Sequence, residues 1–168
     1  MHNVIQAHNK KILNKMNNEV EEPKCNCRNE CILPNKCRSK CVVYKATTQD
    51  NKKVEYIGST SGDFKLRYNN HTASFKNEEK KHNTALSLYV WNNKLNQNNN
   101  NEYKKPNLQW EILKKCKIYI EGGHHCDLCI SEKIYLLRNI NNPSAINHRS
   151  DLGNKCIHKK QVTLAAIN

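Results

Sequence analysis

Four side chains that could act together on a phosphate ester lie close to one another in the sequence. They are two phenols, a guanidinium and an imidazole, contributed by Tyr44, Tyr56, Arg67 and His71. A guanidinium is a planar fork that suits phosphate oxygens, whereas a lysine acts as a looser point charge. A phenol can orient or deprotonate an attacking water, but its ordinary pKa of ~10 demands nearby positive charge at neutral pH. The set therefore indicates phosphate-ester hydrolysis, with Arg67 stabilising the developing charge.

The sequence around these residues predicts a β-hairpin followed by a helix. β-Branched and aromatic residues fill 42–48, and apolar and polar residues alternate in 54–58, with polar turn material between them. Capping side chains precede Phe64, where the apolar spacing becomes helical. Arg67 and His71 are four residues apart on this helix, so they share a face and can point together toward the hairpin tyrosines.

Glu132 is the acidic side chain in the least polar setting. It lies in a predicted helix over 126–137, where its helical neighbours are Leu128, Tyr135 and Leu136. A carboxylate on such a strip faces inward, and burying it without a partner is unfavourable. The carboxylate therefore needs a cation, a hydrogen-bond donor or protonation, and the two main alternatives are an ion pair with Lys or Arg and a bound divalent cation.

The spacing of the hairpin and helix residues resembles that of the GIY-YIG nuclease superfamily. Tyr56-Ile57-Gly58 matches the second motif of the family completely. At the first motif, Val42-Val43-Tyr44 keeps the tyrosine but lacks the glycine. Arg67 and His71 then follow on the next helix, as the resemblance requires.

The resemblance covers residues 41–150. Residues 126–137 resemble the late helix of the family with its metal-binding glutamate, here Glu132, and Asn147 lies where a late asparagine often occurs. More narrowly, Tyr-Ile-Gly-Ser-Thr at 56–60, with the Arg and His that follow and a late Cys-x2-Cys pair, is similar to nuclease domains of eukaryotic retroelements, particularly the Penelope-like group.

What the resemblance implies is a metal-dependent endonuclease, a hydrolase that cuts DNA phosphodiester bonds. It implies catalytic roles for Tyr44, Tyr56, Arg67, His71 and Glu132, and substrate contacts from Gly58, Lys65 and Asn147. Glu132 would hold Mg²⁺ or Mn²⁺, a hard cation that stabilises the leaving oxygen. Either tyrosine could be the base, with Tyr56 the preferred candidate, and His71 could relay the proton or hold a tyrosine in place.

A monomer with one such site would nick one DNA strand per encounter. In a retroelement, the nick would expose a 3′ hydroxyl for reverse transcription, so the expected partner is DNA, with RNA or a reverse transcriptase as further candidates, and the expected location is the nucleus. Two alternatives stay open. One is a zinc-stabilised nucleic-acid-binding module that has lost catalysis, and the other is a repair nuclease specific for branches or flaps.

The first cysteine cluster contains Cys25, Cys27, Cys31, Cys37 and Cys41. Clustered cysteines in a chain without an export signal more often bind metal or stay as thiols than form disulfides. Four thiolates could form a tetrahedral zinc site, and Cys41 is the expected outsider. Free thiols are the alternative.

The second cluster combines Cys126-x2-Cys129 with Cys156-x-His158, two ligand pairs separated by enough chain for the late helix. His124, His125 and Cys116 could replace members of this set. A zinc ion with four protein ligands leaves no open position for water, so either zinc would be structural.

The composition agrees with a polyanion-binding protein. The chain has 28 Lys and Arg against 15 Asp and Glu, a net charge of +13, which attracts polyanions, although a merely basic protein would share this balance. No stretch approaches the ~20 apolar residues of a membrane span, and the N-terminus lacks the apolar core of a signal peptide. We therefore expect an intracellular protein that does not contact a membrane.

The predicted fold is α+β, a small three-stranded antiparallel sheet flanked by helices. A hydrophobic content of 37% over 168 residues allows one modest core. Residues 108–112 alternate as a third strand, and 84–91 form another helix. The expected organisation is a helical lead-in over 1–24, a Cys-rich segment over 25–41, the nuclease-type domain over 42–158 and a tail over 159–168. In the lead-in, residues 1–22 are expected to form a polar helix, and in the domain, Asn98–Asn101 are expected to form a solvated loop.

Overall fold

The computed structural model describes residues 24–27, 31–49, 53–96, 107–120, 125–147, 149–153, 155–156 and 158. Within these residues the order of elements is β1 (Val42–Thr48), β2 (Glu55–Thr60), α2 (Phe64–Lys76), the 3-10 helix η1 (Glu78–Lys80), α3 (Ala85–Asn96), β3 (Leu108–Lys115), α4 (Asp127–Asn139) and the 3-10 helix η2 (Arg149–Gly153). The predicted helix over 1–22, the Asn98–Asn101 loop and the tail over 159–168 lie outside the described residues.

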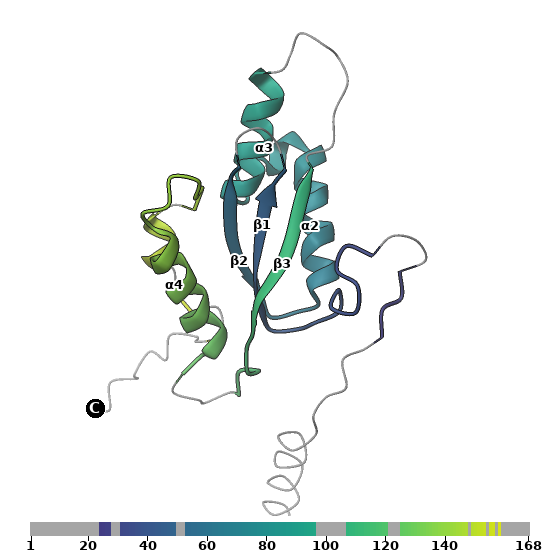
Figure 1. Ribbon diagram of the computed structural model, residues 1–168, viewed down its shortest axis with the longest axis vertical. Coiled ribbons are helices and arrows are strands. Elements are labelled where there is room, and N and C mark those ends of the chain that lie inside the picture. The colour runs from purple at the N-terminus through teal and green to yellow at the C-terminus, as the bar shows by residue number, and fades with distance from the viewer. Residues whose placement is uncertain are drawn as a thin grey trace, which may run out of the picture.

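The three strands form one antiparallel sheet in the order β2-β1-β3 (Figure 1). Tyr44 of β1 lies opposite Gly58 of β2, and Ala46 lies opposite Tyr56. On the other side of β1, Ala46 lies opposite Trp110 of β3. The sheet and its flanking helices confirm the predicted α+β class, place Tyr44 next to Trp110 and bring both hairpin tyrosines into one core with it.

β3 is longer than the apolar pattern predicts. It continues past Ile112 to Lys115, because the backbone pairing with β1 goes on to Val42 and Val43. Lysines occupy the last two positions of the strand, so the apolar alternation stops before the hydrogen-bonded ladder does.

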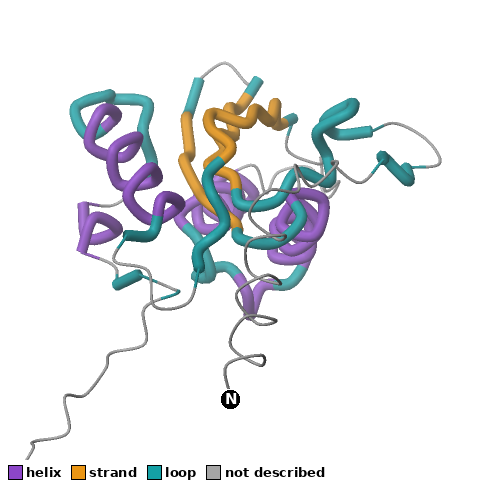
Figure 2. Tube along the Cα trace, turned by 90° about the horizontal axis from the view of Figure 1, so that it is seen from below, coloured by secondary structure: helices purple, strands orange, loops and turns teal. Residues whose placement is uncertain are grey.

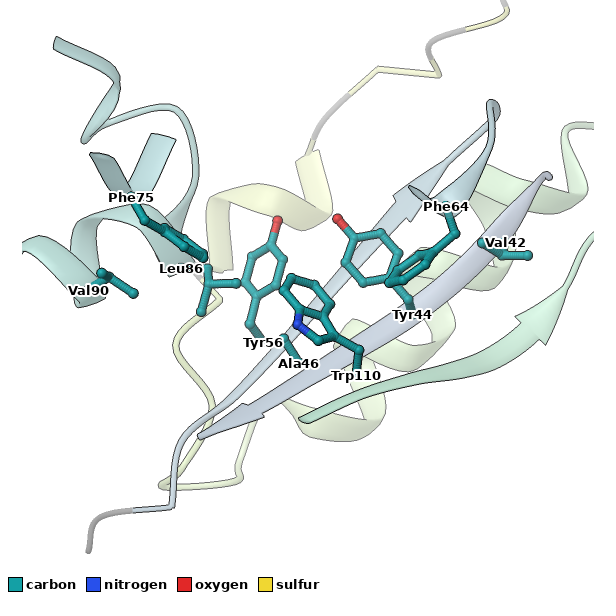
Figure 3. Packing of buried hydrophobic residues seen from close by; sticks show 9 residues of the cluster. All are labelled: Val42, Tyr44, Ala46, Tyr56, Phe64, Phe75, Leu86, Val90 and Trp110. Atoms are coloured by element: carbon teal, nitrogen blue, oxygen red, sulfur yellow. The ribbon is translucent and has the colours of Figure 1, made fainter. Parts of the chain in front are cut away.

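The sheet packs against α2 and α3 on one face and against α4 on the other (Figures 1 and 2). Successive strand residues point to opposite faces, so β1 divides its side chains between two cores. The core under α2 and α3 contains Val42, Tyr44, Ala46, Tyr56, Phe64, Phe75, Leu86, Val90 and Trp110 (Figure 3). The core under α4 contains Cys41, Val43, Ile57, Cys116, Cys126, Leu128 and Leu136.

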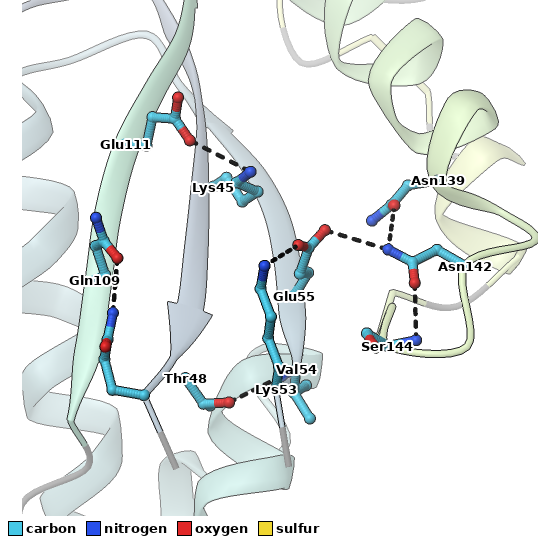
Figure 4. Close-up of polar contacts among 11 residues, drawn as sticks. Lys45, Thr48, Lys53, Val54, Glu55, Gln109, Glu111, Asn139, Asn142 and Ser144 are labelled. Carbon is cyan, nitrogen blue, oxygen red and sulfur yellow. Dashed lines mark hydrogen bonds and ion pairs between the residues drawn. The ribbon is translucent and has the colours of Figure 1, made fainter. Parts of the chain in front are cut away.

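The free edge of β2 is covered by the chain that follows α4. The N–H of Glu55 donates to the carbonyl of Ser144 at 2.8 Å, and the N–H of Ile146 donates to the carbonyl of Glu55 at 3.0 Å. The side-chain amide of Asn142 also donates to the Glu55 carboxylate at 3.2 Å (Figure 4). These bonds fix the C-terminal side of α4 against the hairpin.

In the described part of the chain, no helix has the length and apolar character needed to cross a bilayer.

Candidate functional site

Tyr44 lies at the centre of a buried polar group. Its side chain is fully enclosed, and its hydroxyl accepts a hydrogen bond from Arg67 Nε at 2.9 Å. The same hydroxyl lies 2.8 Å from His71 Nε2. Burial, together with the charge of Arg67, lowers the pKa of His71 to about 3, so the ring is neutral at physiological pH. The neutral Nε2 can therefore accept the Tyr44 proton, which completes a chain from Arg67 to Tyr44 to His71.

The order of the elements along the chain explains why Tyr44, Arg67 and His71 come together. Tyr44 points from β1 into the α2 face of the sheet, and α2 begins at Phe64, so Arg67 and His71 fall on successive turns of its inner side. The Tyr44 ring packs edge-on against Phe64 and His71, with centroid distances of 5.3 and 5.9 Å. Aromatic packing therefore fixes the ring while the two polar partners fix the hydroxyl.

Gly58 has a packing role, and its predicted contact with substrate stays a prediction. A Cβ at this position would lie 2.6 Å from the Tyr44 hydroxyl oxygen and 2.8 Å from Tyr44 Cζ. Its neighbour across the strand pair is Tyr44 itself. The glycine is needed because the phenol passes directly over the β2 backbone.

Tyr56 is the phenol that borders open space. It is 7% exposed and lines a pocket of about 550 Å³, together with Arg67 and Glu132. The hydroxyls of Tyr56 and Tyr44 point to the same side of the aromatic core (Figure 3). Burial raises the pKa of Tyr56, and the neighbouring Tyr44 raises it further, whereas the charge of Arg67 opposes both effects.

Glu132 borders the pocket from α4. Its side chain is half-buried, and burial raises its pKa, whereas a hydrogen bond with Ser59 and the charge of Arg67 lower it. Among the described residues, no ion pair joins Glu132 to a Lys or Arg side chain. Leu128 and Leu136, one turn away on either side, are buried as the pattern predicts. The structure thus places a carboxylate without a salt bridge beside the pocket.

Lys65 and Asn147 both have hydrogen-bond partners within the protein, and the substrate contacts predicted for them stay predictions. Lys65 Nζ donates to Asn26 Oδ1 at 2.9 Å, on the Cys-rich segment, and Lys65 is not among the residues lining the pocket. Asn147 lines the pocket, but its side chain pairs with the backbone of Ile57, accepting at 2.7 Å and donating at 2.9 Å. Asn147 therefore holds the edge of β2, and Lys65 ties α2 to the cysteines.

The pocket is also lined by Ser59, which belongs to the Tyr-Ile-Gly-Ser-Thr motif, and by polar side chains that the sequence did not single out, among them Asn70, Lys133, Asp151 and Lys155. Lys133 follows Glu132 directly, so it could have been found as the neighbour of a motif residue. Asp151 lies in the short 3-10 helix η2 and Lys155 in the irregular chain beyond it, where no periodic pattern gives a signal. They add a second carboxylate and a second amine to the pocket.

The four cysteines Cys25, Cys27, Cys31 and Cys37 form the first cluster, and their Sγ atoms all lie within 4.8 Å of one another. Cys25 Sγ lies 3.5 Å from Cys31 Sγ. Tetrahedral zinc with Zn–S bonds of about 2.3 Å places its sulfur ligands about 3.8 Å apart, so this spacing could hold a metal such as zinc. Cys41 lies outside the cluster, as predicted, with its Sγ directed at the carbonyl of Lys117 at 3.3 Å.

Cys126, Cys129, Cys156 and His158 form the second cluster, with ligand atoms again within 4.8 Å of one another. Cys126 Sγ lies 3.2 Å from His158 Nδ1. This cluster also could hold a metal such as zinc. Of the predicted substitutes, Cys116 and His125 are not part of the group, and His124 lies outside the described residues.

No protein-family model, no curated protein sequence and no solved structure matches this chain significantly.

Proposed function

We propose that this protein is a metal-dependent endonuclease of the GIY-YIG type, which hydrolyses phosphodiester bonds of DNA. One observation carries the proposal: Tyr56, Arg67 and Glu132, which are far apart in sequence, line one pocket, and Tyr44 and His71 support Arg67 from behind. The net charge of +13 supports a polyanionic substrate.

Arg67 is assigned to the phosphate. Its Nε is occupied by Tyr44, which orients the guanidinium, and its side chain borders the pocket. A fork fixed in this way can donate to phosphate oxygens without reorganising as negative charge develops. The lowered pKa of His71 keeps a second cation out of the buried group, because a protonated imidazole would lie beside Arg67.

The two tyrosines take different parts. Tyr56 borders the pocket, so its hydroxyl can contact the attacking water. Tyr44 is fully enclosed and hydrogen-bonded to Arg67 and His71, so it positions the guanidinium while its hydroxyl donates a hydrogen bond to the neutral His71 Nε2. This division of roles favours Tyr56 as the group nearest the reaction.

Glu132 would hold Mg²⁺ or Mn²⁺, with Asp151 as a second carboxylate on the same pocket. Glu132 forms no ion pair with another described residue and its pKa is raised, which fits a carboxylate whose natural partner is a cation. Such an ion, when bound, supplies positive charge that stabilises the leaving 3′ oxygen.

Both cysteine clusters are proposed to bind structural zinc, because each supplies four ligands and therefore leaves no position for water. A monomer with one site would nick one strand. A nick with a 3′ hydroxyl would suit retroelement insertion in the nucleus, and RNA or a reverse transcriptase would then be additional partners. The missing glycine of the first motif does not count against activity, since Val42 and Val43 are both fully buried, away from the pocket.

The test compares the parent protein with Glu132→Ala on supercoiled plasmid in Mg²⁺. Circular dichroism and filter binding first establish that both proteins fold and hold DNA. We expect nicking by the parent alone, and cleavage of linear duplex and flap substrates then separates an insertion nuclease from a repair nuclease. If the parent binds but never nicks any of these substrates, the endonuclease proposal is wrong and the binding module takes its place.

A further inference from the structure

We infer that the two cysteine clusters separately position the two helices, α2 and α4, that carry the charged side chains of the pocket. The first cluster sets the start of α2 and thereby Arg67, and the second sets the start of α4 and thereby Glu132. The inference rests on the proposed function for the meaning of these two side chains. The contacts that carry it do not depend on any reaction.

The first turn of α2 takes its backbone partners from the first cluster. The N–H of Lys65 donates to the carbonyl of Cys37 at 2.7 Å, and the N–H of Phe64 donates to the carbonyl of Ser39 at 3.0 Å. Asp63, at the N-cap, makes no side-chain capping bond. N–H groups at the beginning of a helix lack intrahelical partners, so a ligand residue of the cluster satisfies one of them.

Ion pairs add to this attachment at the same helix end. Arg38 and Lys40, which flank the last turn of the Cys-rich segment, pair with Asp63 at 3.4 and 3.7 Å. The N–H of Arg67 donates to the carbonyl of Asp63 at 3.2 Å. Partly exposed ion pairs are individually weak, so the attachment depends on the segment holding its shape. Four thiolates gathered around one ion would give it that shape.

The second cluster is built into the first turn of α4. Cys126 is the N-cap residue, and its carbonyl accepts from the N–H of Ile130 at 3.0 Å. Cys129 lies three residues before Glu132, so the two share a helix face, and both line the pocket. A ligand of the cluster is therefore also part of the wall that presents Glu132.

The other two ligands bring in the chain after α4. Cys156 and His158 meet the start of α4, and Lys155, next to Cys156, lines the pocket. The His158 ring stacks on Tyr119 with a centroid distance of 5.3 Å and an interplanar angle of 18°. One ion shared by these ligands would thus hold Glu132 and Lys155 in fixed relation.

The two helices differ in the additional contacts that hold their charged side chains. Arg67 is also held by Tyr44 from the sheet, whereas Glu132 has a hydrogen bond with Ser59 and no ion pair in the described ranges. Lys114 Nζ donates to Asp127 at 2.8 Å, which keeps α4 attached to β3. Loss of the second metal should therefore loosen α4 locally without unfolding the domain.

The experiment uses the zinc-loaded full chain and two matched pairs of variants. His158→Ala removes a ligand, and His158→Cys replaces it with another, while both lose the stacking on Tyr119. Cys25→Ser and Cys25→His are the equivalent pair for the first cluster. The readouts are zinc per chain, hydrogen exchange of amides 64–68 and 129–133, and Mn²⁺ affinity measured by paramagnetic resonance.

For His158→Ala we expect the loss of one zinc, faster exchange over 129–133 alone, and Mn²⁺ binding weakened by about 10-fold or more. His158→Cys should keep the zinc content, the exchange over 129–133 and the Mn²⁺ affinity close to those of the parent. Cys25→Ser should lose one zinc and accelerate exchange over 64–68 alone. Equal acceleration of both segments, or zinc loss without any change in exchange, would overturn the inference, as would a parent that takes up no zinc.

A second route covers the case in which His158→Ala does not fold. The parent is stripped with a chelator, and exchange is measured before and after one and two equivalents of zinc are returned. The same preparation of Cys25→Ser can refill only the second cluster, which should restore protection to 129–133 but not to 64–68; the opposite pattern contradicts the inference. Because exchange reports on structure, this result stands whether or not the parent nicks DNA, and the plasmid assay alone decides the proposed function.

Discussion

The two halves of the pocket are held in place in different ways. On the α2 half, the Tyr44 ring is enclosed by aromatic side chains, and its hydroxyl fixes Arg67 and His71. On the α4 half, Glu132 is half-buried and hydrogen-bonded to Ser59, and the chain around it is attached by polar groups.

This difference follows from how apolar side chains are distributed. The core under α2 and α3 contains five aromatic side chains among its nine buried residues, whereas the buried residues of the core under α4 are aliphatic side chains and cysteines. A small domain has little apolar surface to bury, so the second half needs other attachments. We propose that the second cysteine cluster and the Asn147 amide provide them, and that the α4 half is therefore the adjustable one.

The strongest way to break the α2 half is to remove its cation. Arg67→Ala should lower the single-turnover nicking rate by about 100- to 1000-fold, because a preorganised charge stabiliser is lost. Arg67→Lys is the matched variant. It keeps the positive charge but not the planar fork, so its nicking rate should lie between those of the parent and Arg67→Ala. A parental rate in a folded Arg67→Ala protein would refute the role assigned to Arg67.

Gly58→Ala tests whether the α2 half depends on close packing. The added methyl group would lie 2.6 Å from the Tyr44 hydroxyl oxygen, so the ring must shift. We expect the free energy of unfolding to fall by about 1 to 3 kcal/mol in urea titrations. Gly62→Ala is the control, since its Cβ would have only Thr60 Oγ1 nearby, at 4.0 Å, and should change little. Equal effects at both glycines would contradict this explanation.

Glu132→Gln tests the α4 half, where function and stability should oppose each other. Burial raises the pKa of Glu132 above the ordinary value of 4.5, so the folded state holds the proton more tightly than the unfolded state. The free energy of unfolding of the parent therefore falls as the pH rises from 4.5 through the raised pKa. In the absence of divalent metal, the amide should stabilise the fold by about 0.5 to 1 kcal/mol at pH 8 and by nothing at pH 4. Urea titrations at both pH values measure this, and destabilisation at pH 8 would show that the carboxylate has a favourable partner.

Sequence patterns predicted most of the elements but only part of the site. Period-two and helical spacing predicted the three strands, α2, α3 and α4, although β3 continues over Lys114 and Lys115 because backbone pairing does not require apolar side chains. The substrate contact predicted for Lys65 stays a prediction. Lys65 and Arg67 are two residues apart on a helix, however, so they point to different sides.

By itself the sequence indicated the two cysteine clusters, the buried strip around Glu132 and the shared face of Arg67 and His71, while it left the final membership of each cluster open. All of these depend on short spacings, which local backbone geometry converts directly into direction. The tertiary structure alone decided that Tyr56 borders the pocket while Tyr44 is enclosed, that Gly58 makes room for a phenol, and that Asn147 pairs with the backbone of Ile57 across 90 residues of chain. Such contacts arise only when separate elements pack together, because the partner of a side chain is then set by the surface that it meets and not by its neighbours in sequence.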